Sequence, residues 1–217
     1  MVVIPQSVLE KIDDHPDRKR KFIEDTIAEK LEVIEQLSGD RDNGRMVANM
    51  KKEVEKLRDN LAELHAKEEK KKKKDEKKEA IKKANAKIKA QELLERETDD
   101  NLNFDDLGID AILVDEAHEY KHLGFATAMQ RGVKGVDPSP SKKCQGLFLK
   151  VKAIQERSGG RNVVFATGTP ISNTAAEIWT FMRYLMPKEE MEAYNIWYFD
   201  DFVRNFGSIQ QMLEYGT

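Results

Sequence analysis

Cysteine is almost absent from this sequence of 217 residues, and long apolar runs do not occur in it. Cys144 is the only cysteine, which excludes an internal disulfide and favours a reducing cytoplasm. No run of roughly 18 apolar residues is found, so no transmembrane helix is expected. Residues 1–6 lack the positive charge and long apolar core of a signal peptide. These absences favour a cytoplasmic protein without a membrane anchor.

The sequence also lacks a phosphate-binding loop, in which four residues separate two glycines and the second glycine is followed by lysine and then serine or threonine. Gly39 and Gly44 have the glycine spacing, but Arg45 and Met46 follow them. This stretch is a turn between two helical patterns, whereas a phosphate-binding loop follows a strand. The chain therefore lacks the amides and lysine that bind most of the charge of a nucleoside triphosphate.

Charge is unevenly distributed along the chain. The net charge of −3 gives no overall attraction to nucleic acid, yet twelve lysines and five acidic residues lie between Lys67 and Ala90. This segment is either a solvated helix or an arm that contacts backbone phosphates. It contains no aromatic residue for stacking on bases, so base readout is not expected. The candidate nucleic-acid-binding residues are Lys71, Lys72, Lys73, Lys74, Lys77 and Lys78.

Apolar residues recur at helical spacing on both sides of a turn at residues 38–44. The first pattern extends from Phe22 to Leu37, and the second has heptad-like steps from Met46 to Leu64. No proline or glycine occurs between Arg45 and Asp100, so the second helix is expected to reach roughly 80 Å. We predict a long antiparallel helical hairpin, similar to a coiled coil, with a lysine-rich second arm.

An apolar run of four residues, 111–114, leads directly into two acidic residues, Asp115 and Glu116. The run predicts a strand buried on both faces, as in parallel α/β sheets, which bind ligands at the carboxyl ends of their strands. Aspartate at such a strand end holds Mg²⁺ in nucleotide-hydrolysing sites. We therefore predict that Asp115 holds Mg²⁺ and that Glu116 polarises the attacking water. The alternative is a strand that ends in solvated acids.

A second buried strand is predicted at residues 162–165, and a small polar turn follows it. Right-handed crossovers place the ends of neighbouring parallel strands side by side. Thr167 and Thr169 are therefore expected to hydrogen-bond the acidic turn and to pass its state to another surface. A helix-capping turn is the alternative. The predicted fold class is α/β, a parallel sheet with helices and an inserted helical hairpin.

The stretches ILVDEAHEYKHL (112–123) and VVFATGTPISNTAAEIWTFMRYLMP (163–187) resemble motifs II and III of superfamily-2 helicases, specifically the Swi/Snf-type DNA translocases. The resemblance extends to a bacterial and phage subgroup in which the helicase is joined to an adenine-specific DNA methyltransferase. Residues 103–110 and 199–202 are similar to further segments of that subgroup. The resemblance is close over residues 102–207 and loose over residues 2–12.

This resemblance implies a partial RecA-like lobe, with ATP and Mg²⁺ as cofactors. It implies double-stranded DNA, the remainder of the helicase and a possible methyltransferase domain as partners. The implied domains are a first strand and helix at 1–14, the hairpin insertion at 15–98, and a core with motifs II and III and an aromatic C-terminal segment at 99–217. The implied site residues are Asp115 for Mg²⁺, Glu116 for water, His118 as the link to motif III, and Thr167, Gly168, Thr169 and Pro170 as the coupling element.

The isolated chain is expected not to hydrolyse ATP, because the phosphate-binding loop and the arginine-bearing motifs of the second helicase lobe are absent from its sequence. A steady-state phosphate-release assay checks this. ATP turnover by the isolated chain that is abolished by changing Glu116 would contradict it.

Two other functions remain open. His118, Glu119 and His122 fit the zinc-metallopeptidase signature, in which two histidines bind zinc and the glutamate is the general base. That site needs a third ligand, such as Glu156 or Glu177. The helical hairpin also fits a non-enzymatic, coiled-coil docking module. One equivalent of bound zinc that is lost on changing His122 would support the peptidase, and a salt-resistant dimer would support the docking module.

Overall fold

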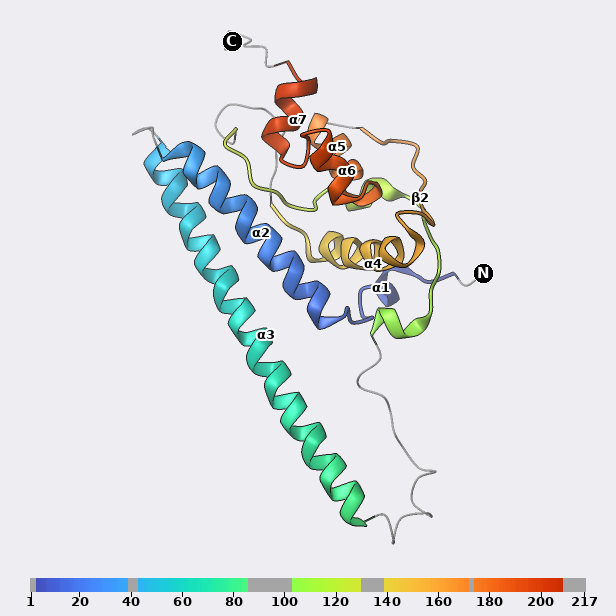
Figure 1. Cartoon of the computed structure of the whole chain (residues 1–217). Coiled ribbons are helices and arrows are strands. Elements are labelled where there is room, and N and C mark those ends of the chain that lie inside the picture. The colour runs from blue at the N-terminus through green and yellow to red at the C-terminus, as the bar shows by residue number, and fades with distance from the viewer. Residues whose placement is uncertain (1–2, 39–42, 86–102, 130–138, 172–173, 209–217) are drawn as a thin grey trace.

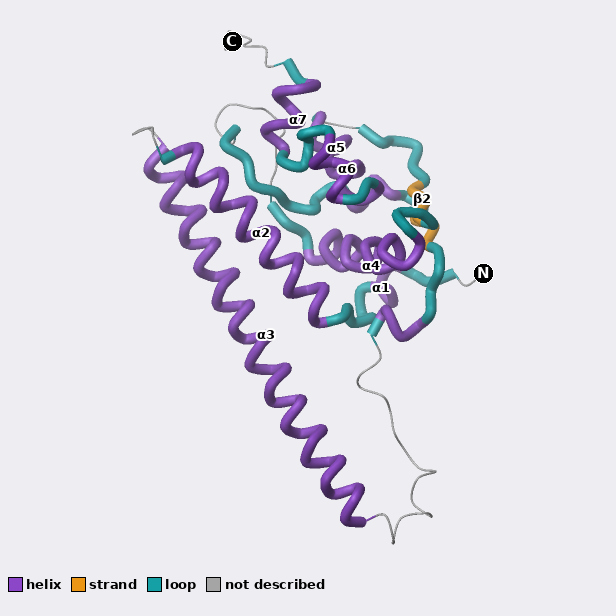
Figure 2. The backbone as a smooth tube through the Cα atoms, in the orientation of Figure 1, coloured by secondary structure: helices purple, strands orange, loops and turns teal. Residues whose placement is uncertain are grey.

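The computed structural model describes residues 3–38, 43–85, 103–129, 139–171 and 174–208, and for residues 71–85 it describes the helical backbone alone. A hairpin of two helices lies along one side of a body of shorter helices and two strands (Figure 1). Most of the described chain is helical (Figure 2). No helix in these ranges is both long enough and apolar enough to cross a membrane.

The two strands, β1 (Ile112–Val114) and β2 (Val163–Phe165), run parallel, as predicted. Helix α4 (Lys142–Ser158) lies between them in the chain, and Leu147 and Val151 of α4 are buried against Val114. Apolar residues at helical spacing produce this buried face of α4. The helix ends at Gly159, which adopts the left-handed conformation (φ 65°) that is common at helix C-caps.

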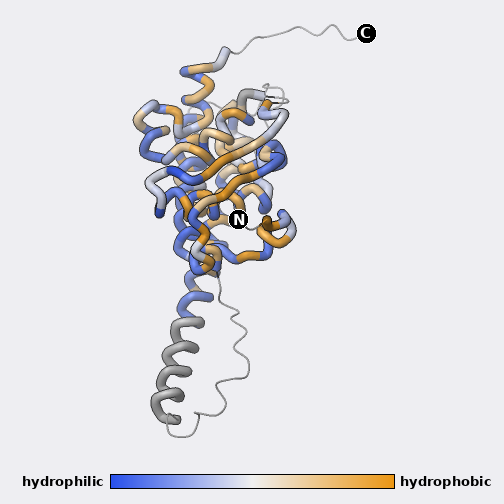
Figure 3. Tube along the Cα trace, turned by 90° about the vertical axis from the view of Figure 1, so that its right-hand side faces the viewer, coloured by the Kyte–Doolittle hydropathy of each residue, from blue (hydrophilic) through white to orange (hydrophobic). Residues whose placement is uncertain are grey.

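Burial of the strands on both faces is not observed within the described part of the chain. Leu113 is 73% exposed and its register partner Val164 is 53% exposed. Side chains alternate across a strand, so these two lie on the face opposite Val114, which is buried. Helix α4 packs against the Val114 face only. Figure 3 views the molecule from the side on which the strands lie.

Helices α2 (Pro16–Leu37) and α3 (Gly44–Asn85) form the predicted antiparallel hairpin. Pro16 occupies the first turn, and the Nδ1 atom of His15 accepts the Asp17 N–H at 3.3 Å. The apolar stripes of the two helices share one cluster, made of Val33, Ile34, Leu37, Met46, Met50 and Val54. Residues 86–98, which were predicted to continue the second helix, lie outside the described residues.

Helix α3 is much longer than its partner. It has 42 residues and α2 has 22, a difference of about 30 Å at 1.5 Å per residue. The far end of α3 extends beyond α2 and away from the body (Figures 1 and 3). The second arm of the hairpin is therefore longer than the first within the described residues, as predicted.

The N-terminal strand expected within residues 1–14 is not observed over its described residues. Val3 and Ile4 are outside any strand, Val3 is 82% exposed, and helix α1 (Gln6–Leu9) follows Pro5. Proline lacks an N–H and so interrupts a strand ladder. Asp13 instead forms an isolated parallel bridge with Asn103, and its carbonyl oxygen accepts the N–H of Phe104 at 2.8 Å.

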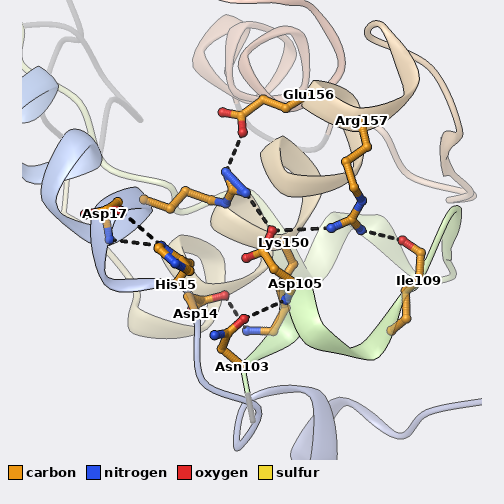
Figure 4. Close-up of polar contacts among 10 residues, drawn as sticks. Asp14, His15, Asp17, Asn103, Asp105, Ile109, Lys150, Glu156 and Arg157 are labelled. Carbon is orange, nitrogen blue, oxygen red and sulfur yellow. Dashed lines mark hydrogen bonds and ion pairs between the residues drawn. The ribbon is translucent and has the colours of Figure 1, made fainter. Parts of the chain in front are cut away.

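A polar network fastens the start of α2 to the body (Figure 4). Arg18 donates to Asp105 of the 3₁₀ helix η2 (Phe104–Leu107) at 2.7 Å and to Glu156 of α4 at 2.6 Å. Lys150 of α4 pairs with Asp14 at 2.9 Å, and the two side chains are 2% and 9% exposed. Burial raises the pKa of the Asp14 carboxyl, and the hydrogen bond from Lys150 opposes that rise. These contacts fix the base of the hairpin on the body.

Three helices complete the body: α5 (Ala175–Leu185), α6 (Lys188–Ala193) and α7 (Phe199–Phe206). Lys152 of α4 donates to the carbonyl oxygens of Tyr184 (3.3 Å) and Met186 (2.8 Å). These hydrogen bonds give a partner to carbonyl groups at the C-terminal end of α5. Burial lowers the pKa of Lys152 to about 7. Trp197, Phe199 and Phe202 of the aromatic C-terminal segment pack with Phe125 and Trp179 in a second core.

Asp200 of α7 is buried and holds the chain after β1 in place. Its carboxylate accepts one hydrogen bond from the Thr127 hydroxyl and another from the Ala128 N–H, the latter at 2.8 Å. The sequence pattern gave no signal for this contact, because the partners are more than 70 residues away along the chain. Asp200 thereby joins α7 to the segment that follows the acidic turn.

Candidate functional site

The acidic turn and the polar turn meet at the carboxyl ends of the two strands. The ladder continues beyond the strands, because the Ala166 N–H donates to the Val114 carbonyl (2.8 Å) and the Ala117 N–H donates to the Ala166 carbonyl (2.9 Å). Asp115 and Glu116 follow β1, and residues 167–170 follow β2. Both polar turns therefore lie at the same edge of the sheet, the edge at which parallel sheets bind ligands.

Glu116 adopts a left-handed backbone conformation, with φ 50° and ψ 45°. For a residue with a side chain this conformation costs about 1–2 kcal/mol, and such strain is concentrated at functional sites. The Glu116 N–H donates to the Asp115 carboxylate at 2.9 Å, and the 3₁₀ helix η3 (Ala117–Tyr120) begins directly afterwards. The sharp turn leaves both carboxylates exposed at the strand end. They are accessible to an incoming cation or ligand.

His118 connects the acidic turn to the polar turn. Its Nδ1 atom lies 3.1 Å from Oε2 of Glu116 and 3.2 Å from Oγ1 of Thr167. The same Thr167 oxygen accepts the Thr169 N–H at 3.2 Å. A carboxylate can only accept hydrogen bonds, so a proton on Nδ1 satisfies the contact with Glu116. A continuous chain of polar contacts thus runs from Glu116 through His118 to Thr167 and Thr169.

Gly168 and Pro170 complete the polar turn without joining this chain of contacts in the described structure. A Cβ atom built on Gly168 would meet nothing within 4 Å, so the glycine leaves open space beside the turn. Pro170 and Thr169 are exposed. The structure therefore brings Asp115, Glu116, His118 and Thr167 together and places Gly168 and Pro170 on the accessible side of the turn.

Two ion pairs hold η3 against the neighbouring helices. Lys143 of α4 donates to Glu119 at 2.9 Å, and this hydrogen bond lowers the pKa of the Glu119 carboxyl. Lys121 donates to Glu177 of α5 at 3.0 Å, and their side chains are only 7% and 12% exposed. The Lys121–Glu177 pair was missed at the level of sequence, because no local pattern joins residues 56 positions apart.

The residues of the zinc-metallopeptidase signature are not arranged as that chemistry requires. The helix η3 has four residues and ends before His122, so His118 and His122 do not share one face of an α-helix. Glu156 pairs with Arg18, and Glu177 pairs with Lys121. Over the described ranges, no group of three or more His, Cys, Asp or Glu side chains is placed to hold a metal ion.

Asp115 fits a different kind of metal site, one that is completed from outside the protein. Mg²⁺ keeps several waters and is bound by one or two carboxylates together with substrate phosphates. An exposed carboxylate at a strand end, with a second one beside it, meets the protein's part of that requirement. The residues present thus fit Mg²⁺, whereas the loop that would bind the phosphates is absent from the sequence.

The candidate nucleic-acid-binding lysines at 71–74, 77 and 78 belong to α3, and the structure describes their helical backbone but not their side chains. This part of α3 lies in the half that extends beyond α2, far from β1 and β2 (Figure 1). The lysine-rich segment and the acidic turn are therefore two separate regions of the molecule.

Comparisons with known proteins place the chain among helicase-related sequences. Residues 46–216 match a family model described as a probable helicase domain. A stretch of 106 residues is 27% identical to the protein named Defense against restriction protein B of Escherichia phage P1. That stretch covers 48% of this chain and 5% of the phage protein, so the chain spans a small part of this relative's length. No solved structure matches the chain.

Proposed function

This chain belongs to the probable helicase domain family, and from that membership we propose that it is a segment of an ATP-dependent translocase acting on double-stranded DNA. The resemblance of residues 112–123 and 163–187 to motifs II and III supports the proposal that the parent protein belongs to the Swi/Snf-type branch of superfamily 2. The body would be part of a RecA-like lobe, into which the hairpin is inserted. ATP and Mg²⁺ are the proposed cofactors, and the cytoplasm is the proposed location.

The observation that carries this proposal is the contact of His118 with both Glu116 and Thr167, at 3.1 and 3.2 Å. In the proposed mechanism Asp115 would hold Mg²⁺ through water and Glu116 would orient the attacking water. A change in charge beside Glu116 alters how the Nδ1 proton of His118 is shared between Glu116 and Thr167. The polar turn formed by Thr167, Gly168, Thr169 and Pro170 then passes that change toward DNA.

The proposal requires partners, because the chain contains no phosphate-binding loop. The remainder of the helicase would supply that loop and the second lobe. We further propose that the parent protein carries an adenine-specific methyltransferase. The name of the phage relative refers to defence against restriction, and DNA modification or defence against foreign DNA is the setting that we propose for the parent.

Metal binding at the strand end tests the proposed site in the isolated chain. Mn²⁺ substitutes for Mg²⁺ and broadens the NMR signals of nearby groups. We expect millimolar Mn²⁺ to broaden the amide signals of residues 115–117 and this effect to be lost in an Asp115→Asn variant. Asp110→Asn is the matched control, because Asp110 is an exposed carboxylate at the opposite end of β1. Equal broadening in the Asp115→Asn variant would refute the assignment of Asp115.

A further inference from the structure

Helix α5 carries an ion pair near each end, one buried and one part-buried, and the two pairs lead in opposite directions. Near its start, the Glu177 carboxylate accepts a hydrogen bond from the Lys121 ammonium at 3.0 Å. Lys121 directly follows η3, the helix that contains His118. Near its end, Arg183 donates to Glu29 of α2 at 2.7 Å. Helix α5 therefore contacts both the segment that bears the candidate site and the helical hairpin.

The Arg183–Glu29 pair is enclosed more completely than the other contacts of the hairpin with the body. The two side chains are 4% and 6% exposed. The guanidinium carbon of Arg183 lies 4.7 Å from the ring centre of Trp197 and 5.0 Å from that of Trp179. Breaking a buried pair leaves an uncompensated charge that water does not solvate. Movement of α2 away from α5 is therefore opposed, and the two helices are held as one unit.

Other polar contacts of α2 lead elsewhere. Asp25 pairs with Lys188 of α6 at 2.8 Å, with side chains about one third exposed. Arg18 pairs with Glu156 of α4. Among these contacts, the Glu29 pair is the one that reaches α5, and α5 in turn reaches Lys121. The Glu29–Arg183 pair therefore connects the hairpin, through α5, to the candidate site. The pairs with α4 and α6 only attach the hairpin to the body.

We propose that Glu177 and Arg183 are positioning residues, through which the hairpin and the His118 contact with Thr167 are coupled. Both residues lie on the 11-residue helix α5, six residues apart, which is about 9 Å along the helix axis, and a helix is rigid over that distance. Coupling of this kind is reciprocal, so a change at either end is felt at the other. The functional meaning of the coupling rests on the proposed function, since His118 is assigned there to the link between the two motifs. The coupling itself is a property of this chain and needs neither ATP nor DNA.

The experiment reads His118 while the distant pair is altered. Imidazole signals of the four histidines are recorded by NMR on the labelled full chain and are assigned with His118→Gln. Glu29→Gln keeps the shape of the side chain and removes the charge that Arg183 binds. We expect this change to shift the His118 signals. Asp25→Asn is the matched control, because it breaks the α2–α6 pair, and it should leave the His118 signals in place.

A double-mutant comparison separates coupling from a merely structural effect. In a Glu177→Gln background, where the connection of α5 to Lys121 is broken, Glu29→Gln should no longer shift His118. Circular dichroism establishes that each variant is folded, and Arg183→Lys replaces Glu29→Gln if that variant unfolds. Unmoved His118 signals in the folded Glu29→Gln chain would overturn the proposal. So would an equal shift in Asp25→Asn, or a shift that persists without Glu177. Failure here leaves the Mn²⁺ test of the proposed site unaffected.

Discussion

Replacing Arg183 with methionine is expected to lower the free energy of unfolding by about 3–5 kcal/mol, because Glu29 is then left buried without its partner. Methionine fills a similar volume, so the loss reports the stranded charge more than a cavity. Urea unfolding at neutral pH, followed by tryptophan fluorescence, measures it. Lys188→Met is the matched control: its pair with Asp25 is about one third exposed, and its loss should cost less than about 1 kcal/mol. Similar losses in the two variants would contradict the prediction.

The pH dependence of this loss follows from Glu29. Burial raises the pKa of the Glu29 carboxyl, and Arg183 opposes that rise, so Arg183→Met raises the pKa further. A carboxyl whose pKa is higher in the folded state than in the unfolded state destabilises the fold above that folded-state pKa. The penalty disappears as the pH falls below the unfolded value, about 4.3. The difference between variant and parent chain should therefore shrink as the pH is lowered from 7 toward 4.

If the lysine-rich segment contacts backbone phosphates, replacing the six lysines at 71–74, 77 and 78 with glutamine is expected to abolish most of the binding of duplex DNA. If each lysine neutralises one phosphate, the slope of log K against log salt should become shallower by about 5. A protein with that many contacts loses about 10³ in affinity between 50 and 200 mM salt. Fluorescence anisotropy of a labelled duplex over a salt series measures both quantities.

The matched control for the lysine variant lies on the same helix. Lys51, Lys52 and Lys56 are exposed on the half of α3 that packs beside α2, and changing them to glutamine should have a smaller effect. Deleting the whole hairpin is a poorer test, since Phe22 and Glu29 of α2 contribute to the packing of the body. Unchanged binding by the six-lysine variant would show that the lysine-rich segment is a solvated helix face.

Periodic features of this chain were predictable from its sequence, because a single local interaction repeats along each of them. The apolar spacing from Phe22 to Leu37 and from Met46 to Leu64 predicted a hairpin, and the helices α2 and α3 form it. The apolar runs before Asp115 and Thr167 predicted parallel strands with adjacent ends, which β1 and β2 provide. Each of these predictions depended only on residues close together in the sequence.

Features that depend on distant partners were not predictable in this way. Glu29 lies on the buried side of α2 although buried glutamate is rare, and its partner Arg183 is 154 residues away. The sequence around Glu29 contains no signal for this pairing. The expected N-terminal strand failed over Val3 and Ile4 for a related reason, because a β-like run becomes a strand only where a neighbouring strand is available. The left-handed backbone of Glu116 likewise depends on the turn that its surroundings impose.

The unequal lengths of the two hairpin helices have a mechanical consequence. Helix α3 has 42 residues and is about 63 Å long, and its apolar cluster with α2 is formed by Met46, Met50 and Val54 near its start. A rigid rotation of α3 by about 5° around its packed end would displace the free end by about 5 Å. That displacement exceeds the rise of one base pair, about 3.4 Å. A rotation of a few degrees at the packed end would thus be amplified, at the lysine-rich end, to a displacement on the scale of one base-pair step.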